Sequence, residues 1–171
     1  MKPLAPDEKN STVMVYTHNL LARGQVVTNE HLRVSIWLRT QGAPNFIHLF
    51  NPNVILFGGT PPKSLNFSEF FVPITDVIAF HLAPPASDPL DYDENESNRM
   101  MQPVHMLVGS FTLRSKLRVS TQTDLATSLD VSQSTWLSVY EADIGNPYLP
   151  QFNMHVPMLL VRPSHVNFGL V

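Results

Sequence analysis

The side chains with the widest range of possible chemistry in this sequence are its seven histidines, which could ligate a metal ion if the fold brought them together. They are His18, His31, His48, His81, His105, His155 and His165. No two show the His-x-His or His-x-x-x-His spacing that places two imidazoles on one side of a strand or helix. His48 and His81 lie in predicted strands and could face each other, so a metal-dependent barrel enzyme is the third hypothesis. The spacing indicates scattered histidines, and we expect no metal site and no cofactor.

Motifs of common enzymes are missing as well. The sequence has no cysteine, no Gly-x-Ser-x-Gly nucleophile elbow, and no Gly-x-Gly-x-x-Gly or Gly-Lys-Ser phosphate loop. The acidic run from Asp91 to Glu96 resembles the start of a calcium loop. However, Glu96 and Gln102 stand where an EF-hand needs glycine and glutamate. We therefore expect a protein that is not an enzyme.

Four basic side chains are the candidates for binding an anionic ligand. Arg33 and Arg118 each occupy the second position of a Leu-Arg-Val-Ser tetrapeptide, and Arg114, Lys116 and Arg118 are spaced by two, which places them on one face of a strand. Guanidinium groups bind phosphate in a bidentate manner, so Arg33 and Arg118 could flank one small anion or nucleotide. The alternative is that each arginine bonds loop carbonyls near its own position. We expect this separated arrangement, because a shared site would recruit more basic residues.

A cluster of phenylalanines is the candidate contact surface. Phe67, Phe70 and Phe71 lie within five residues of one another. This is more aromatic surface than a strand with one buried face can cover. We interpret the three residues as a partner surface or a self-association edge, with burial on both faces of the strand as the alternative.

A pattern of matching residues occurs twice in the sequence. Gly24 and the tetrapeptide at 32–35 are followed, 85 residues later, by Gly109 and the tetrapeptide at 117–120. A Val-Pro pair at 72–73 recurs at 156–157. This self-similarity predicts a tandem duplication in which Gly24 and Gly109 occupy matching backbone positions.

The predicted boundaries follow from this repeat and from one acidic segment. Residues 1–11 form a loose tail, 12–82 the first β repeat, 83–101 an acidic, proline-rich linker or loop, and 102–171 the second β repeat. Five acidic residues fall between Ala83 and Asn98, which is typical of an exposed linker. We expect the two repeats to form one fused domain, with two separate small domains as the alternative.

Each predicted repeat resembles a small β-rich bacterial domain of unknown function that occurs singly or in tandem. Members of that family carry an Arg-x-Ser-x-x-Leu helical turn, which Arg33 and Leu38 match in the first repeat. The second repeat keeps Arg118 but has Thr123 at the leucine position, with Leu125 two residues further on. The resemblance implies a β-rich repeat and carries no activity with it.

Alternating apolar residues and turn signals give the expected secondary structure. The expected strands are 12–28, 46–57, 70–82, 103–114, 135–144, 154–161 and 166–171, and the expected short helices are 36–40 and 121–129. Each repeat is thus strand, short helix, strand, strand. We predict a mainly β fold, a pseudo-two-fold β-barrel or β-sandwich of about six to eight strands.

Composition narrows the function classes. The 171 residues include 11 Lys and Arg against 14 Asp and Glu, giving a net charge of −3. This excludes a strongly basic nucleic-acid coat, and the absence of cysteine excludes a disulfide scaffold. No uninterrupted apolar segment predicts a membrane span or a secretory signal, so we expect a cytoplasmic protein without nucleic-acid or membrane partners.

The resulting hypotheses belong to different classes. The first is a non-catalytic β domain that works by contact with a protein partner or with itself, as a homo-oligomer. The alternative is a module that binds a small anionic ligand or nucleotide through Arg33 and Arg118.

Overall fold

Antiparallel strands make up most of the chain in the computed structural model, which describes residues 4–170. The strands are β1 (Glu8–Tyr16), β2 (Leu20–Asn29), β3 (Phe46–Leu56), β4 (Lys63–Asn66), β5 (Glu69–Pro73), β6 (Ala79–Leu82), β7 (Arg99–Val108), β8 (Phe111–Ser120), β9 (Leu137–Gly145), β10 (Asn153–Val161) and β11 (Val166–Gly169). The helical segments are η1 (Val34–Arg39), η2 (Ile74–Asp76), α1 (Leu125–Val131) and η3 (Pro163–His165).

All eleven strands belong to one sheet. Its order is β11-β7-β8-β9-β10-β6-β1-β2-β3-β4, and β5 also pairs with β3. The mainly β prediction is confirmed. The sheet has more strands than the predicted six to eight, and its path is open rather than closed as a barrel.

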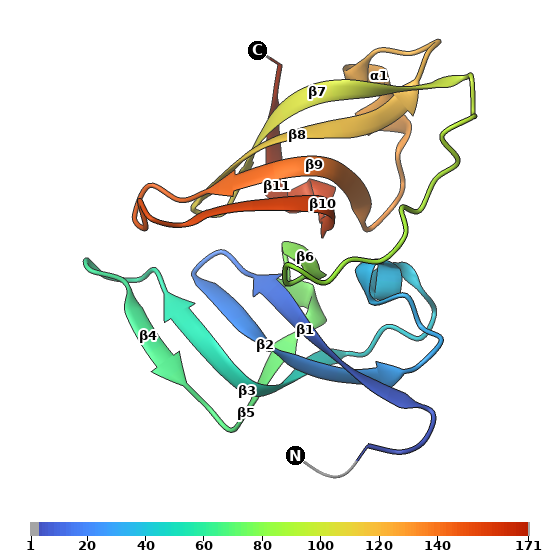
Figure 1. Cartoon of the computed structure of the whole chain (residues 1–171). Helices are drawn as coiled ribbons and strands as arrows, with labels where there is room; N and C mark the ends of the chain where they lie inside the picture. Colours follow the sequence, from blue (N-terminus) through green and yellow to red (C-terminus); the bar gives the residue numbers. More distant parts are fainter. Residues whose placement is uncertain (1–3, 171) are drawn as a thin grey trace.

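The strand pairing follows the same connectivity in residues 8–82 and 99–169, which we call unit 1 and unit 2. In each unit the first two strands form a hairpin, the third pairs with the second, and the last pairs back with the first. A one-turn 3₁₀ helix, η2 or η3, precedes the last strand. β4 and β5 together hold the place in unit 1 that β10 holds in unit 2. Figure 1 shows the units one above the other, with β6 between them.

The two units also share an irregularity at the same point of the sheet. The register shifts between Arg23 and Gln25 on β2, and between Arg114 and Lys116 on β8. Opposite each shift, the third strand of the unit contains a non-glycine residue in the left-handed region, Asn51 with φ 47° and Glu141 with φ 50°. The two β-bulges therefore mark equivalent positions in the units.

The alignment predicted from the Leu-Arg-Val-Ser match is wrong. Gly24 lies inside β2, whereas Gly109 forms the turn between β7 and β8 with a φ of 58°. The first tetrapeptide enters η1, and the second lies at the end of β8. When the units are aligned on their bulges, Arg23 corresponds to Arg114. This alignment differs by six residues from the one that the tetrapeptides suggest.

The two units share their cores. The core of unit 1 includes Trp136 and Leu160 of unit 2, and the core of unit 2 includes Met14, Tyr16 and Ile78 of unit 1. This arrangement arises because β1, β6 and β10 lie at the middle of the sheet and bury side chains on both faces. Removing either unit would expose apolar surface of the other.

Several element boundaries differ from the sequence prediction for local reasons. β1 begins at Glu8, which pairs with Asn29, so residues 8–11 belong to the sheet rather than to a loose tail. Helix α1 begins after Asp124, whose carboxylate accepts a hydrogen bond from the Thr127 N–H at 2.8 Å, and not after Ser120. The parts of the predicted tail and last strand at residues 1–3 and 171 lie outside the described residues. No helix among the described residues is long and apolar enough to span a membrane.

Candidate functional site

The acidic segment, residues 83–98, contains no helix or strand, yet it is held against both units. From unit 1, the Ser35 N–H donates to the Asp88 carboxylate at 2.8 Å, and Arg33 donates to the Pro89 carbonyl. From unit 2, Arg118 donates to the Asp93 carbonyl and to the Glu96 carboxylate, both at 2.7 Å. The segment is therefore a strap that ties the units together. Most of its residues are exposed, as its composition predicts.

Asp91 is the most constrained residue of this strap. Its carboxylate pairs with Arg39 and accepts hydrogen bonds from Ser138 at 2.6 Å and Tyr140 at 2.7 Å. Burial by itself raises the pKa of the Asp91 carboxyl. The two hydroxyl hydrogen bonds and the charge of Arg39 outweigh burial and hold that pKa below its ordinary value. Asp91 thus remains ionised and joins η1 of unit 1 to β9 of unit 2.

The predicted arginine pair does not form a common anion site. Arg33 and Arg118 both bond backbone carbonyls of the strap, four residues apart along the chain, and Arg118 also stacks on Tyr92 at 4.6 Å. Each arginine thus bonds a loop carbonyl, which is the local role that the separated arrangement assigns to it. Arg114 and Lys116 are exposed on β8, on the strand face that also carries Arg118.

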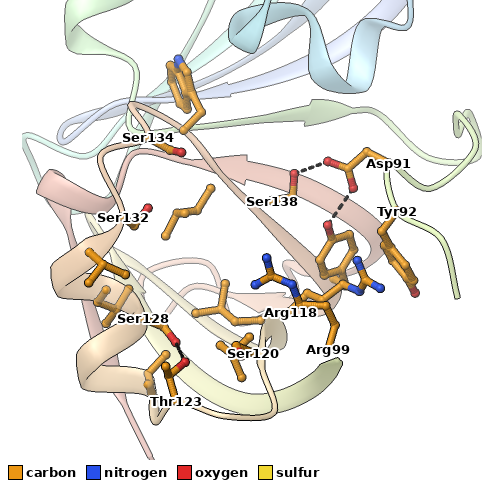
Figure 2. Close-up of a pocket in the computed structure, with 18 of the residues that line it drawn as sticks. Asp91, Tyr92, Arg99, Arg118, Ser120, Thr123, Ser128, Ser132, Ser134 and Ser138 are labelled. Atoms are coloured by element: carbon orange, nitrogen blue, oxygen red, sulfur yellow. Dashed lines mark hydrogen bonds between the residues drawn. The ribbon is translucent and has the colours of Figure 1, made fainter. Parts of the chain in front are cut away.

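A cavity of about 520 Å³ opens between the strap, α1 and the facing strands β8 and β9. Its apolar floor includes Leu117, Leu125 and Leu137, and hydroxyl groups line much of its rim. Figure 2 shows Thr123, Ser128 and Ser132 on the side of α1, and Ser138, Arg99 and Arg118 on the side of the strap. The hydroxyl-bearing residues of the lining are Ser120, Thr123, Ser128, Ser132, Ser134 and Ser138, together with Tyr92 and Tyr140.

Most charged groups of this cavity are already paired inside the protein. Arg39 is bound to Asp91 and Arg118 to Glu96, while Arg99 lies 3.6 Å from Glu96. Between residues 4 and 170, no three His, Asp or Glu side chains converge as they would to hold a metal ion. The cavity therefore offers an apolar floor, hydroxyl groups and one loosely held cation.

A second candidate surface is an aromatic face on the outer side of β3 and β5. We define it as Phe46, His48, Phe50 and Phe71. The His48 ring stacks on Phe71 with centroids 4.2 Å apart and lies 4.1 Å from Phe50, and its Nε2 contacts Glu69 at 2.7 Å. Phe46 is 53% and Phe71 54% exposed, so two large apolar side chains lie open to solvent on adjacent strands.

The predicted phenylalanine surface is thereby divided. Phe71 belongs to the aromatic face, whereas Phe70 points the other way and packs on the core of unit 1. Phe67 is exposed beyond the end of β4 and stacks on Phe70 at 5.1 Å. Burial on both faces, the alternative considered from the sequence, does not occur, because Phe71 is exposed while Phe70 packs inward.

Sequence reasoning considered His81 only as a possible metal-binding partner of His48, and it did not single out the groove beside β5. The two histidines bond different residues, His81 the Tyr16 hydroxyl and His48 the Glu69 carboxylate. His81 is fully buried, and its Nε2 lies 2.8 Å from the Tyr16 hydroxyl. A groove of about 360 Å³ runs between β5 and the β1–β2 turn, where the rings of His18 and His165 are joined by a 3.2 Å contact between ring nitrogens. The signal for His81 is its place between two apolar strand residues, Phe80 and Leu82. The groove has no sequence signal, because it depends on the packing of both units.

Comparison of the chain with protein-family models, with curated proteins and with solved structures found no match.

Proposed function

We propose that this chain is a non-catalytic β domain that works by binding further copies of itself through the aromatic face. The observation that carries the proposal is the adjacent exposure of Phe46 and Phe71 on β3 and β5. Exposing two phenylalanine rings on neighbouring strands is unfavourable in water, and exposed apolar patches are typical of protein contact surfaces. Aromatic side chains are also enriched at the centres of such surfaces.

The rest of the face suits a specific contact. His48 and Glu69 place a hydrogen-bonded polar pair beside the rings, which is the usual arrangement of an apolar centre with a polar rim. The stack of His48 on Phe71 also holds the exposed ring in one orientation, so less side-chain entropy is lost when a partner binds.

The test is the molar mass of the whole chain in solution, measured by sedimentation velocity over a range of concentrations. We expect association of the native chain, and a loss of association of at least about tenfold when Phe46→Ser and Phe71→Ser are combined. Tyr148→Ser is the matched control, because Tyr148 is an aromatic residue 59% exposed in the β9–β10 loop. A native chain that stays monomeric at every concentration would contradict the proposal, as would equal effects of the double variant and the control.

A second candidate function is binding of a small anionic ligand in the cavity beneath the strap. The observation that favours it is Arg99, which reaches the cavity and contacts Glu96 only at 3.6 Å. Calorimetric titration with inorganic phosphate and with a nucleoside monophosphate tests it. Binding that is lost in Arg99→Ala and kept in Lys116→Ala would support a ligand site, and no binding by the native chain would remove it.

A further inference from the structure

The sheet contains an internal junction in which a strand of one unit pairs with a strand of the other. β6 of unit 1 lies antiparallel to β10 of unit 2, with Phe80 opposite Leu160 and Ala79 opposite Val161. The Arg162 N–H extends this ladder by donating to the Ile78 carbonyl at 2.9 Å. All four paired residues are buried, so this junction is a continuous part of both cores.

The bulges identify which residue of unit 1 corresponds to each junction residue on β10. Phe50 and Tyr140 directly precede the left-handed residues of the two bulges. Their partners across the ladder are Glu69 and Met158. Counting two residues onward, Phe71 on β5 is the counterpart of Leu160 on β10.

The same counting identifies the counterpart of β6. On β2, the residue at the bulge is Gly24, which pairs with Val13 on β1. On β8, the residue at the bulge is Ser115, which pairs with Val104 on β7. Two residues onward along the first strand of each unit, Val15 pairs with Phe80 and Met106 pairs with Phe168. Phe168 on β11 is therefore the counterpart of Phe80 on β6.

Each counterpart strand lies at an edge. Among the described strands, β5 pairs only with β3, and β11 pairs only with β7. An unpaired strand edge is a template for adding another strand. The counterparts of the two junction strands thus lie at separate edges of the sheet. The counterpart of β10 is β5 in unit 1, and the counterpart of β6 is β11 in unit 2.

Four residues buried at or beside the internal junction have counterparts that are exposed large apolar residues. The pairs, with the buried member first, are Leu160 and Phe71 (54% exposed), Trp136 and Phe46 (53%), Leu82 and Leu170 (62%), and Tyr16 and Leu107 (53%). Four of the large exposed apolar side chains of this chain are accounted for by this one relation. At the paired positions themselves, Val72, the counterpart of Val161, is buried, and Phe168, the counterpart of Phe80, is partly buried.

The groove beside β5 is an independent observation that favours an added strand at this edge. In unit 2, the turn at Gly109 lies against β6 and its approach, since a Cβ on Gly109 would be 3.1 Å from Ile78 Cδ1. In unit 1, the corresponding space between the β1–β2 turn and β5 is the open groove of about 360 Å³, lined by His18, Leu20, Phe71 and Val72 among others. The space that Ile78, the residue before β6, occupies in one unit is thus an open groove in the other.

We infer that copies of this chain join head to tail, with β11 of one copy adding to β5 of the next and filling its groove. This inference rests on the proposed self-association and specifies its geometry. The contact is heterologous, so assemblies grow beyond two copies, as a ring if the rotation closes and as a filament if it does not. Asn167 stands at the position of the buried Ala79, so the contact between copies is more polar and weaker than the internal junction.

The test uses two variants of the whole chain that block opposite edges. Phe71→Glu places a charge on β5, and Leu170→Glu places one at the end of β11, where the register brings it near Glu69 of the next copy. Each variant alone is expected to associate at least about tenfold more weakly than the native chain, because a charge on a strand edge opposes pairing. An equimolar mixture is expected to form a 1:1 complex and nothing larger, because one intact β11 meets one intact β5.

The mixture separates this inference from the broader proposal. If the native chain associates but the mixture stays monomeric, self-association stands and the head-to-tail geometry is wrong. If the native chain does not associate, both are wrong. Tyr148→Glu is the charge control and is expected to associate like the native chain, and circular dichroism checks that each variant is folded. If a variant does not fold, amide hydrogen exchange of the native chain decides: association must protect both β5 and β11, and protection of neither contradicts the inference.

Discussion

Lowering the pH is expected to destabilise this protein through one buried histidine. His81 is fully buried in β6, with Nδ1 2.7 Å from the Leu82 carbonyl oxygen and Nε2 2.8 Å from the Tyr16 hydroxyl. Because a carbonyl can only accept, Nδ1 carries the proton and Nε2 accepts from the tyrosine. A second proton on the ring would remove that acceptor and place a charge in the core.

The sign and size of the effect follow from the pKa. Burial lowers the pKa of His81 from 6.5 to about 4, although the hydrogen bond to the Leu82 carbonyl opposes this shift. Between these two values the unfolded chain binds a proton that the folded chain does not. The contribution of neutral His81 is therefore complete above pH 6.5 and is lost as the pH falls toward about 4. At about 1.4 kcal/mol per unit, the loss is about 2 kcal/mol by pH 5 and about 3 kcal/mol by pH 4.

The assay is urea unfolding followed by tryptophan fluorescence at about pH 7.5 and about pH 5, which spans most of the His81 window and avoids most carboxyl titration. His81→Gln is expected to be less stable than the native chain at the higher pH but to lose about 2 kcal/mol less on acidification. His155→Gln is the control, since His155 is exposed on β10. Equal losses in the native chain and in His81→Gln would refute the reasoning.

Two other substitutions test the strap and the hairpin turn of unit 2. Asp91→Asn removes the ion pair with Arg39 and weakens the acceptor for Ser138 and Tyr140, so we expect a loss of about 2 kcal/mol in urea unfolding; unchanged stability would show that the strap does not join the units. Gly109→Ala forces a side chain into a left-handed position 3.1 Å from Ile78, and we expect a loss of about 1–2 kcal/mol. Gly58→Ala, at a site with open space, is expected to change stability by less than about 0.5 kcal/mol, and similar losses at both glycines would contradict this account.

The location of β-rich stretches was the most predictable part of this fold, because their signals are local. The expected strands 12–28, 70–82 and 103–114 are wrong as single strands, since each is interrupted by a turn or a helix and contains parts of two strands. The alternation at residues 13–17 lies in β1, and the aromatic stretch at 46–57 coincides with β3. The expected barrel was less accessible to sequence reasoning. Closure depends on which edges meet, and here β6 pairs with β10 of the other unit and leaves β5 and β11 at edges.

The repeat shows why short matches mislead. The Leu-Arg-Val-Ser tetrapeptides are identical but lie in a loop–helix junction and in a strand. The positions that do correspond share bulge geometry but few identical residues. Val13 with Val104 and Phe80 with Phe168 are two of the identical pairs. Strand packing constrains the size and polarity of a side chain more than its identity.

The candidate sites depended on contacts between residues distant in sequence. From the sequence alone, Asp91 is one residue of an acidic run predicted to be solvated. Its contacts are with Arg39, 52 residues earlier, and Tyr140, 49 residues later, which no local pattern indicates. The phenylalanine cluster at 67–71 did point to a surface. However, the sequence did not show that Phe71 faces outward with Phe46 while Phe70 turns inward.

The most direct test of the central claim is the molar mass of the native chain by sedimentation equilibrium over a wide concentration range. Head-to-tail self-association predicts an average mass that rises with concentration from the monomer value of 19.2 kDa to beyond that of a dimer. A mass that stays at 19.2 kDa at every concentration would contradict the claim that this protein works by self-association.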